Sequence, residues 1–271
     1  MDINDRFQDG LLMLGCGKMG SAMLAGWLDQ GIDPDKIWII EPNPSEWLTS
    51  LSVRLNQDLP ESVALALIAV KPQMMRQALP RLAGYANGPT IFLSVAAGIS
   101  IEAYENILGS GASIVRAMPN TPAAIGKGIT AFIGNDAAGV DDLKLCQDLL
   151  EGIGQTVKLD KETQMDAITG VSGSGPAYVF FMVDSLAAAG QAQGLPAELA
   201  MQLAKATVAG AGLLVEQSHE TPEQLRVNVT SPNGTTQAGL EVLMHPNDGL
   251  GPLMKVTVAK ATYRSRELSG G

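Results

Sequence analysis

Short apolar runs alternate with amphipathic stretches along the first 160 residues. Seven aliphatic runs have the length of buried strands and occupy residues 11–14, 36–40, 63–70, 91–95, 114–117, 129–133 and 156–159. Stretches with helical spacing of apolar residues lie between them, at 19–30, 74–85, 101–108 and 138–152. Strand and helix in alternation predict a mostly parallel sheet with helices on both faces.

From residue 161 onward the pattern predicts only helices. The expected helices occupy residues 174–194, 196–218, 222–229, 235–244 and 250–268, with glycine or proline near several of their ends. Residues 178–183 are apolar around much of the helix, which predicts burial on more than one side. We expect a partner subunit to provide the second side.

Composition and charge narrow the classes of partner. The 271 residues carry a net charge of −10 and no basic block, so we expect no nucleic-acid partner. The longest clean apolar stretch, residues 63–70, is too short to cross a bilayer and the first ten residues are polar, so we expect a cytoplasmic protein without a membrane partner. Cys16 and Cys146 are expected to be reduced thiols. With histidines only at 219 and 245, we expect no metal site.

Three glycines follow the first apolar run, in the segment GCGKMG at residues 15–20. In a strand–turn–helix unit, Gly15 suits the tight turn, Gly17 the close approach of a pyrophosphate, and Gly20 the packing of helix on strand. The helix start also offers amide hydrogens to phosphates. The pattern predicts an α/β protein whose Rossmann-type dinucleotide-binding domain spans residues 1–160, followed by an all-helical domain at 161–271 for the substrate and for dimerisation.

An acidic residue ends the second expected strand. Glu41 lies 21 residues after Gly20, where a carboxylate accepts hydrogen bonds from a ribose diol and repels a 2′-phosphate. This favours NADH over NADPH. Against that, Asn43 and Ser45 offer a loop that suits a phosphate, and a solvated loop carboxylate is the alternative for Glu41.

Small residues, prolines and an amide follow three later strands. The segments are Lys-Pro at 71–72, Ala-Ala-Gly at 96–98 and Met-Pro-Asn at 118–120. Because ligands of open parallel sheets bind beyond the carboxyl ends of the strands, these segments suit a rigid floor for nicotinamide, with Asn120 bonding its carboxamide. Ordinary turn chemistry is the alternative at each position.

Two loops rich in glycine and hydroxyl groups precede helices of the second domain. They read TGVSGSGP at residues 169–176 and TSPNGTT at residues 230–236. Amide hydrogens and hydroxyls at the start of a helix suit a small carboxylate, so the loops predict a substrate pocket. The alternative is that the hydroxyl residues are helix N-caps, namely Ser172, Ser174, Ser231 and Thr235.

Together, five segments resemble the signatures of pyrroline-5-carboxylate reductases. They are GCGKMG at 15–20, AVKP at 69–72, RAMPNTP at 116–122, GVSGSGPAY at 170–178 and SPNGTT at 231–236. The resemblance runs in order from about residue 11 to residue 267. It implies reduction of the C=N bond of L-1-pyrroline-5-carboxylate to L-proline with NADPH or NADH, the last step of proline biosynthesis. It also implies a homodimer, or a larger ring of dimers, paired through the helical domain.

The resemblance and the strand ends together give a set of candidate site residues. The cofactor-binding candidates are Gly15, Cys16, Gly17, Lys18, Met19, Gly20, Glu41, Asn43, Asn56, Ala69, Val70, Lys71, Pro72, Ala96, Ala97, Met118, Pro119 and Asn120. The substrate-binding candidates are Ser174, Asn228, Ser231, Gly234, Thr235 and Thr236. We expect the substrate carboxylate at the amides of Gly234 and Thr235. Thr236 is the candidate catalytic residue, as hydrogen-bond donor to the ring nitrogen.

Two departures from the family pattern concern specificity. Position 233 is Asn where the family usually has Gly, and Asn suits a left-handed turn best among the other residues, so we expect the loop to be kept. Residues 219–223, HETPE, also differ from the usual His-Pro-Gly. Two alternative functions remain: another NAD(P)-dependent reductase of similar build, of the β-hydroxyacid or ketopantoate type, or a non-catalytic dinucleotide-binding regulator. Reductases of the β-hydroxyacid or ketopantoate type need a lysine on the first helix of the helical domain, and residues 172–178 contain none.

Overall fold

The computed structural model describes Phe7 and residues 9–269, which form two compact units. The first unit comprises the described residues up to Gly173 together with those from Ala261 onward. The second unit is Ser174–Lys260. The division expected at residue 160 therefore lies within the first unit, and the roles assigned to segments 1–160 and 161–271 stay a prediction.

An eight-stranded sheet runs through the first unit in the order β3-β2-β1-β4-β5-β6-β7-β8. Its strands are β1 Leu11–Leu14, β2 Ile37–Ile40, β3 Arg54–Leu55, β4 Leu65–Ile68, β5 Ile91–Ser94, β6 Ser113–Met118, β7 Gly128–Gly134 and β8 Gly154–Lys158. Neighbouring strands are parallel except for the antiparallel pair β6–β7. All seven strands expected from apolar runs are present. The sequence analysis missed β3, because a two-residue edge strand leaves no apolar run.

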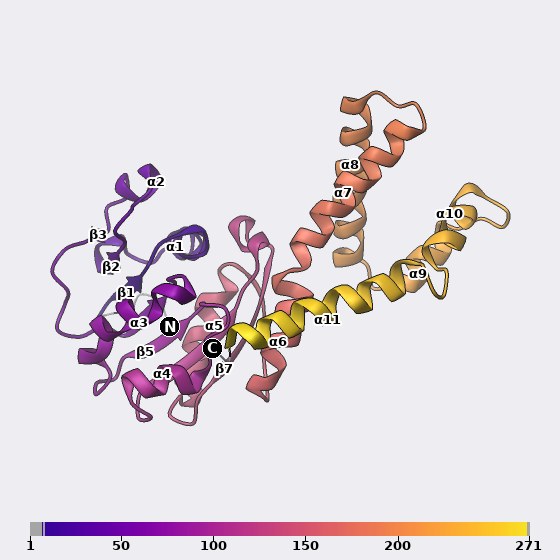
Figure 1. The fold of residues 1–271 in the computed structure, drawn as a ribbon. Helices are drawn as coiled ribbons and strands as arrows, with labels where there is room; N and C mark the ends of the chain where they lie inside the picture. The colour runs from indigo at the N-terminus through magenta and orange to yellow at the C-terminus, as the bar shows by residue number, and fades with distance from the viewer. Residues whose placement is uncertain (1–6, 8, 270–271) are drawn as a thin grey trace. The chain divides into compact units, whose positions relative to one another are not determined.

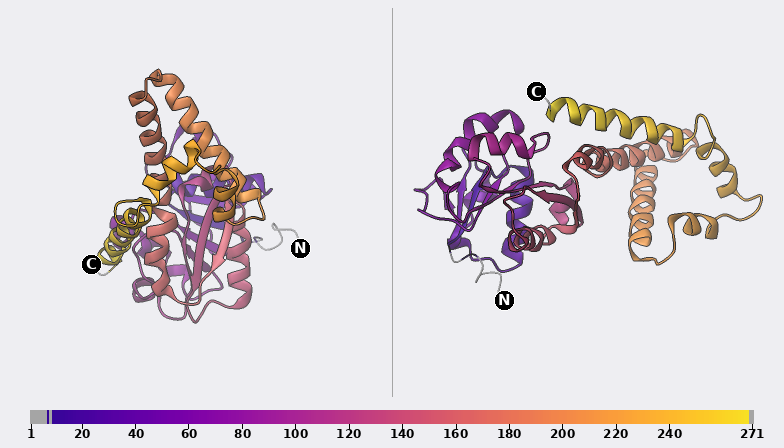
Figure 2. Two further views of the ribbon diagram at one scale, coloured as in Figure 1. Left: turned by 90° about the vertical axis from the view of Figure 1, so that its right-hand side faces the viewer. Right: turned by 90° about the horizontal axis from the view of Figure 1, so that it is seen from below.

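Helices cover both faces of this sheet (Figure 2). They are α1 Lys18–Asp29, α2 Glu46–Thr49, α3 Met75–Ala78, α4 Ile101–Leu108, α5 Val140–Glu151 and α6 Met165–Ile168. The single helix expected at residues 74–85 is wrong, since α3 lies between the 3₁₀ segments Pro72–Met74 and Leu79–Tyr85. Pro80 has no amide hydrogen, so a regular α-helix cannot continue through it without losing a bond.

The strands bury side chains on both faces of the sheet. In β1, Leu11 and Met13 point into one core, which also contains Trp27 of α1, whereas Leu12 and Leu14 point into the other. All four strand residues are almost fully buried. Each buried leucine contributes about 1.5–3 kcal/mol of hydrophobic free energy. Burial on both faces explains why these strands read as uninterrupted apolar runs rather than as alternating ones.

The second unit is helical, and its described residues contain no strand, as expected. It holds α7 Gly175–Ala192, α8 Ala197–Gln217, α9 Pro222–Asn228, α10 Thr235–Leu243 and most of α11 Leu250–Ser269, which ends in the first unit. Figure 1 shows α7 and α8 side by side as a hairpin. Phe180 and Phe181 of α7 are 61% and 72% exposed. The apolar surface predicted for this helix is therefore largely uncovered in a single chain.

Candidate functional site

The glycine loop joins β1 to α1 and brings two backbone segments close together. Gly15 has φ 90°, in a region that favours glycine, and its amide donates to the Ile40 carbonyl at 2.9 Å. A Cβ at this position would lie 2.8 Å from the Ala69 carbonyl oxygen and 2.9 Å from Val70 Cγ1. Glycine is therefore required at position 15 both by the turn and by the close approach of the loop that follows β4.

Gly17 differs from the other two glycines because its side-chain position faces open space. It is the N-cap of α1 with an ordinary φ of −71°, and no heavy atom lies within 4 Å of where its Cβ would be. At Gly20 a Cβ would lie 3.0 Å from the Gly15 carbonyl oxygen, so Gly20 allows close helix packing. Open space beside the amide-bearing start of a 12-residue helix fits the pyrophosphate of a dinucleotide.

Glu41 follows β2 and binds the glycine loop. Its Oε2 accepts from the Cys16 amide at 2.8 Å and its Oε1 from the Asn43 amide at 2.9 Å. The Asn56 side chain, just after β3, accepts from the Glu41 amide at 3.0 Å and donates to the Glu41 carbonyl at 2.8 Å. The carboxylate is thus a fixed part of the loop rather than a freely solvated group. Burial raises the pKa of the neighbouring Cys16 thiol, which a hydrogen bond with Ser21 partly offsets.

The other candidate cofactor residues follow strands of the same sheet. Residues 69–72 follow β4, residues 96–97 follow β5, and residues 118–120 lie at the end of β6. Because β3, β2, β1, β4, β5 and β6 are neighbouring parallel strands, their carboxyl ends share one edge of the sheet. The structure therefore places all eighteen candidates along one edge, where open α/β sheets bind ligands.

Asn120 holds backbone segments together at this edge. Its Nδ2 donates to the Ser172 carbonyl at 3.1 Å, and its Oδ1 accepts from the Ile129 amide of β7 at 3.0 Å. Ser172 belongs to a π-helical turn, Thr169–Gly173. One Nδ2 hydrogen remains for another acceptor. The predicted bond from Asn120 to a carboxamide stays a prediction.

A buried polar cluster that the sequence analysis missed supports the loop after β5. The Tyr104 and Ser94 hydroxyls lie 2.5 Å apart, and Ser94 accepts from the Ala96 amide at 3.3 Å. Glu162 accepts from Arg116 and from the Ile101 amide at the start of α4. Burial raises the pKa of Tyr104 to about 12. The sequence signal was Arg116, a cation inside an otherwise apolar strand.

The second unit carries the candidate substrate loop at the start of α10. Gly234 is the N-cap, its amide donates to the Ser231 carbonyl at 3.0 Å, and Thr235 and Thr236 are the first helical residues. Asn233 has φ 57°, which confirms the expected left-handed turn. Its amide donates to the Gln237 side chain at 2.7 Å. The loop keeps its turn without glycine at position 233.

The N-cap alternative is wrong for Ser231 and Thr235, whereas Ser174 does occupy an N-cap position. Gly234 caps α10 in place of Ser231 or Thr235, and Ser174, at the N-cap of α7, makes no side-chain capping bond. The Ser172 hydroxyl donates to the Ile168 carbonyl at 3.1 Å and accepts no amide of the following helix. The substrate contacts predicted for Ser174, Ser231 and Thr235 stay predictions.

Asn228, the last residue of α9, is already bonded within the second unit. Its Nδ2 donates to both carboxylate oxygens of Glu220, at 3.0 and 3.1 Å, and its Oδ1 accepts from Gln224 at 2.8 Å. These bonds fix the connection between α8 and α9. Its predicted contact with substrate stays a prediction.

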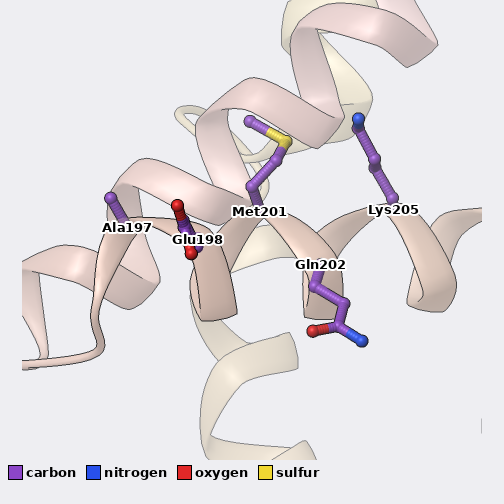
Figure 3. A pocket seen from close by; sticks show the side chains of 5 residues that line it. All are labelled: Ala197, Glu198, Met201, Gln202 and Lys205. Atoms are coloured by element: carbon purple, nitrogen blue, oxygen red, sulfur yellow. The ribbon is translucent and has the colours of Figure 1, made fainter.

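Two surface hollows lie in the second unit, and neither is lined by a candidate residue. One, of about 560 Å³, follows a single face of α8 and is lined by Ala197, Glu198, Met201, Gln202 and Lys205 (Figure 3). The other, of about 460 Å³, lies between α9 and α10. Cys16 and Cys146 form no disulfide, and the described residues contain no group of three His, Cys, Asp or Glu side chains that could hold a metal ion.

The chain matches known proteins along nearly its whole length. A family model for pyrroline-5-carboxylate reductase dimerisation matches residues 162–268, and one for coenzyme F420-dependent NADP oxidoreductases matches residues 11–98. The pyrroline-5-carboxylate reductase of Synechocystis sp. is 38% identical over 263 residues, which cover 94% of this chain and 97% of that protein. The chain belongs to the pyrroline-5-carboxylate reductase family. The resemblance inferred from the five segments is confirmed.

Solved reductases of this family share the fold. The enzyme of Coxiella burnetii superposes with a TM-score of 0.88 at 30% identity and covers 96% of this chain and 98% of its own. The Plasmodium falciparum enzyme, solved with NADP bound, gives a TM-score of 0.83 at 28% identity, covering 96% and 98%. The expected fold class is confirmed: a Rossmann-type domain followed by a helical domain.

Proposed function

We propose that this chain reduces L-1-pyrroline-5-carboxylate to L-proline with NADPH or NADH. The observation that carries the proposal is 38% identity with a pyrroline-5-carboxylate reductase over almost the full length of both chains. The glycine loop supports it, because Gly17 leaves room for a pyrophosphate at the start of α1. We place this reaction as the last step of proline biosynthesis, in the cytoplasm.

The chain's own residues orient the reactants rather than supply a strong acid. The glycine loop would hold the cofactor, whose chemistry there would be the transfer of a hydride to the carbon of the C=N bond. Because the Gly234 amide already donates to Ser231, the Thr235 amide at the start of α10 is the one that binds the substrate carboxylate, and the Thr236 hydroxyl hydrogen-bonds with the ring nitrogen. A cyclic imine is basic enough to arrive protonated, so the reaction needs no buried histidine; His219 and His245 are both exposed. Near-attack positioning of the reacting carbons contributes about 7–11 kcal/mol.

The experiment follows absorbance of the reduced cofactor with purified protein. Oxidation of NADH or NADPH that depends on pyrroline-5-carboxylate, and not on a simple ketoacid, supports the proposal. Oxidation with the ketoacid alone would show a reductase of the β-hydroxyacid or ketopantoate type instead. Cofactor binding without oxidation by either substrate would show a non-catalytic regulator.

A second copy of the chain is the partner that we propose, in a homodimer or a ring of dimers. The dimerisation family model covers residues 162–268, and α7 leaves Phe180 and Phe181 exposed. The hollow along one face of α8 adds a surface to which a second copy can pack (Figure 3).

α8 is an apolar helix of 21 residues. It is long and apolar enough to cross a membrane by length and composition alone, with 11% of its apolar window buried in the single chain. Since it lies within the segment matched by the dimerisation model, we propose that another copy covers it and that a membrane does not.

A further inference from the structure

The Glu41 carboxylate lies at the place where the adenosine ribose meets the glycine loop of a Rossmann-type domain. One oxygen accepts from the Cys16 amide at 2.8 Å, within the glycine loop, and the other from the Asn43 amide at 2.9 Å. An ionised carboxylate has about four acceptor positions, so each oxygen keeps one for a further donor. The two hydroxyls of an unmodified ribose are two such donors.

The Asn56 side chain holds Glu41 in place by bonding to the Glu41 backbone. The Asn56 amide group accepts from the Glu41 amide and donates to the Glu41 carbonyl, while the Asn56 backbone amide donates to Ile39 at 2.8 Å. The backbone of Asn56 is left-handed, with φ 53°. The side chain of Asn56 therefore uses both ends of its amide on Glu41 and acts as a positioning residue.

The chain segment that holds Glu41 is poor in cations, although Lys18 lies in the glycine loop two residues after Cys16. Arg54 is the only lysine or arginine between residues 37 and 70. Its Nε donates to the Asp35 carbonyl at 2.8 Å, and its guanidinium lies 4.9 Å from the centre of the Trp38 ring. Glu41 forms no ion pair with any lysine or arginine among the described residues. A 2′-phosphate at this place would face a fixed negative charge.

We propose that Glu41, held in place by Asn56, selects NADH over NADPH. The inference rests on the proposed function, since it concerns the cofactor of that reaction. The selecting interaction is the pair of remaining acceptor positions, which bind hydroxyls and repel phosphate.

Calorimetry with two redox-inactive fragments tests this without any turnover. The probes are ADP-ribose and 2′-phospho-ADP-ribose, with the wild-type chain, Glu41→Gln and the control Glu46→Gln. Glu46 is an exposed carboxylate in the first turn of α2, on the same loop. We expect the wild type and the control to bind ADP-ribose at least about tenfold more tightly than its 2′-phosphate, because like charges repel. Glu41→Gln should lower this ratio by about tenfold or more.

Asn56→Gly tests the positioning role, because glycine accepts φ 53° and removes only the side chain. We expect a weaker preference for ADP-ribose and a higher KM for NADH with kcat unchanged. A preference for NADH unaltered in Asn56→Gly would refute its role.

Different results would overturn the selection by Glu41 and the proposed function. Equal binding of the two fragments, binding of neither, or an unchanged ratio in Glu41→Gln with wild-type urea unfolding would overturn the selection by Glu41. A chain that discriminates between the fragments yet does not reduce pyrroline-5-carboxylate would overturn the proposed function alone.

Discussion

Replacing two glycines of one loop by alanine is expected to have different effects. Gly15→Ala should lower the stability of the fold, whereas Gly17→Ala should weaken cofactor binding. Gly15→Ala introduces a Cβ at φ 90°, only 2.8 Å from the Ala69 carbonyl oxygen. Gly17→Ala introduces one at φ −71°, with no heavy atom within 4 Å. The first change strains the folded chain, whereas the second occupies space that we assign to a pyrophosphate.

The magnitudes follow from these distances. At Gly15, a left-handed side chain costs about 1–2 kcal/mol and overpacking against backbone about 1–3, less about 0.4–1 gained by restricting the unfolded chain. We expect Gly15→Ala to lower the free energy of unfolding by about 2–4 kcal/mol. At Gly17, losing a glycine N-cap costs a few tenths to about 1 kcal/mol, and the unfolded chain returns a similar amount. Gly17→Ala should therefore stay within about 0.5 kcal/mol of wild type.

Urea unfolding followed by tryptophan fluorescence measures the first effect in the right place. All three tryptophans, at positions 27, 38 and 47, lie in the first unit. Calorimetry with ADP-ribose measures the second, where we expect Gly17→Ala to raise Kd by about a hundredfold, or 2.7 kcal/mol. Wild-type affinity in Gly17→Ala would refute the assignment of the open space. A loss of stability in Gly17→Ala as large as in Gly15→Ala would refute the reasoning from distances.

Three further outcomes are expected. Thr236→Ala should lower kcat by about tenfold or more while leaving the Kd of NADH unchanged; steady-state kinetics and calorimetry check this, and an unchanged kcat would remove Thr236 from the mechanism. Because burial raises the pKa of Tyr104 from about 10 to about 12, its neutral phenol stabilises the fold fully below pH 10, and about 2–3 kcal/mol should be lost as pH rises toward 12. Tyr104→Phe should remove that loss, at a cost of about 1 kcal/mol at pH 7 for the bond to Ser94; urea unfolding across this range checks both. Phe181→Asp should reduce the mass measured by sedimentation, whereas Val140→Asp, at an 83% exposed position of the first unit, should not; an unchanged mass in Phe181→Asp would argue against α7 as the interface.

The sequence predicted the elements whose signals are local. Strands buried on both faces, such as β1, β4 and β5, are continuous apolar runs and were found for that reason. α4 was expected at residues 101–108 and lies there, because Ser100 caps it and Gly109 follows its end. The stretch around Pro80 was misread as one helix, since the spacing of apolar residues carried more weight than the missing amide hydrogen.

Polar clusters built from distant segments were harder to predict. Ser94, Tyr104, Arg116 and Glu162 come from four segments and meet only because β5 and β6 are neighbours. Arg116 signalled a buried partner, but no pattern along the chain names Glu162, 46 residues away. Such pairs depend on tertiary packing, which period and propensity do not encode.

Glu41 shows how contacts bear on two interpretations that the sequence leaves open: they exclude a freely solvated carboxylate, and the ribose partner stays a prediction. Its place after the second strand suited either a ribose partner or a solvated loop carboxylate. A solvated carboxylate has no reason to accept an amide from a segment 25 residues away, as Glu41 does from Cys16, nor to have its own backbone paired by Asn56. The two amides that bond to the Glu41 carboxylate carry no charge, so its negative charge remains. They also occupy only half of its acceptor positions. An acceptor that is fixed, charged and half satisfied at the edge of a cofactor site is suited to choosing between a hydroxyl and a phosphate.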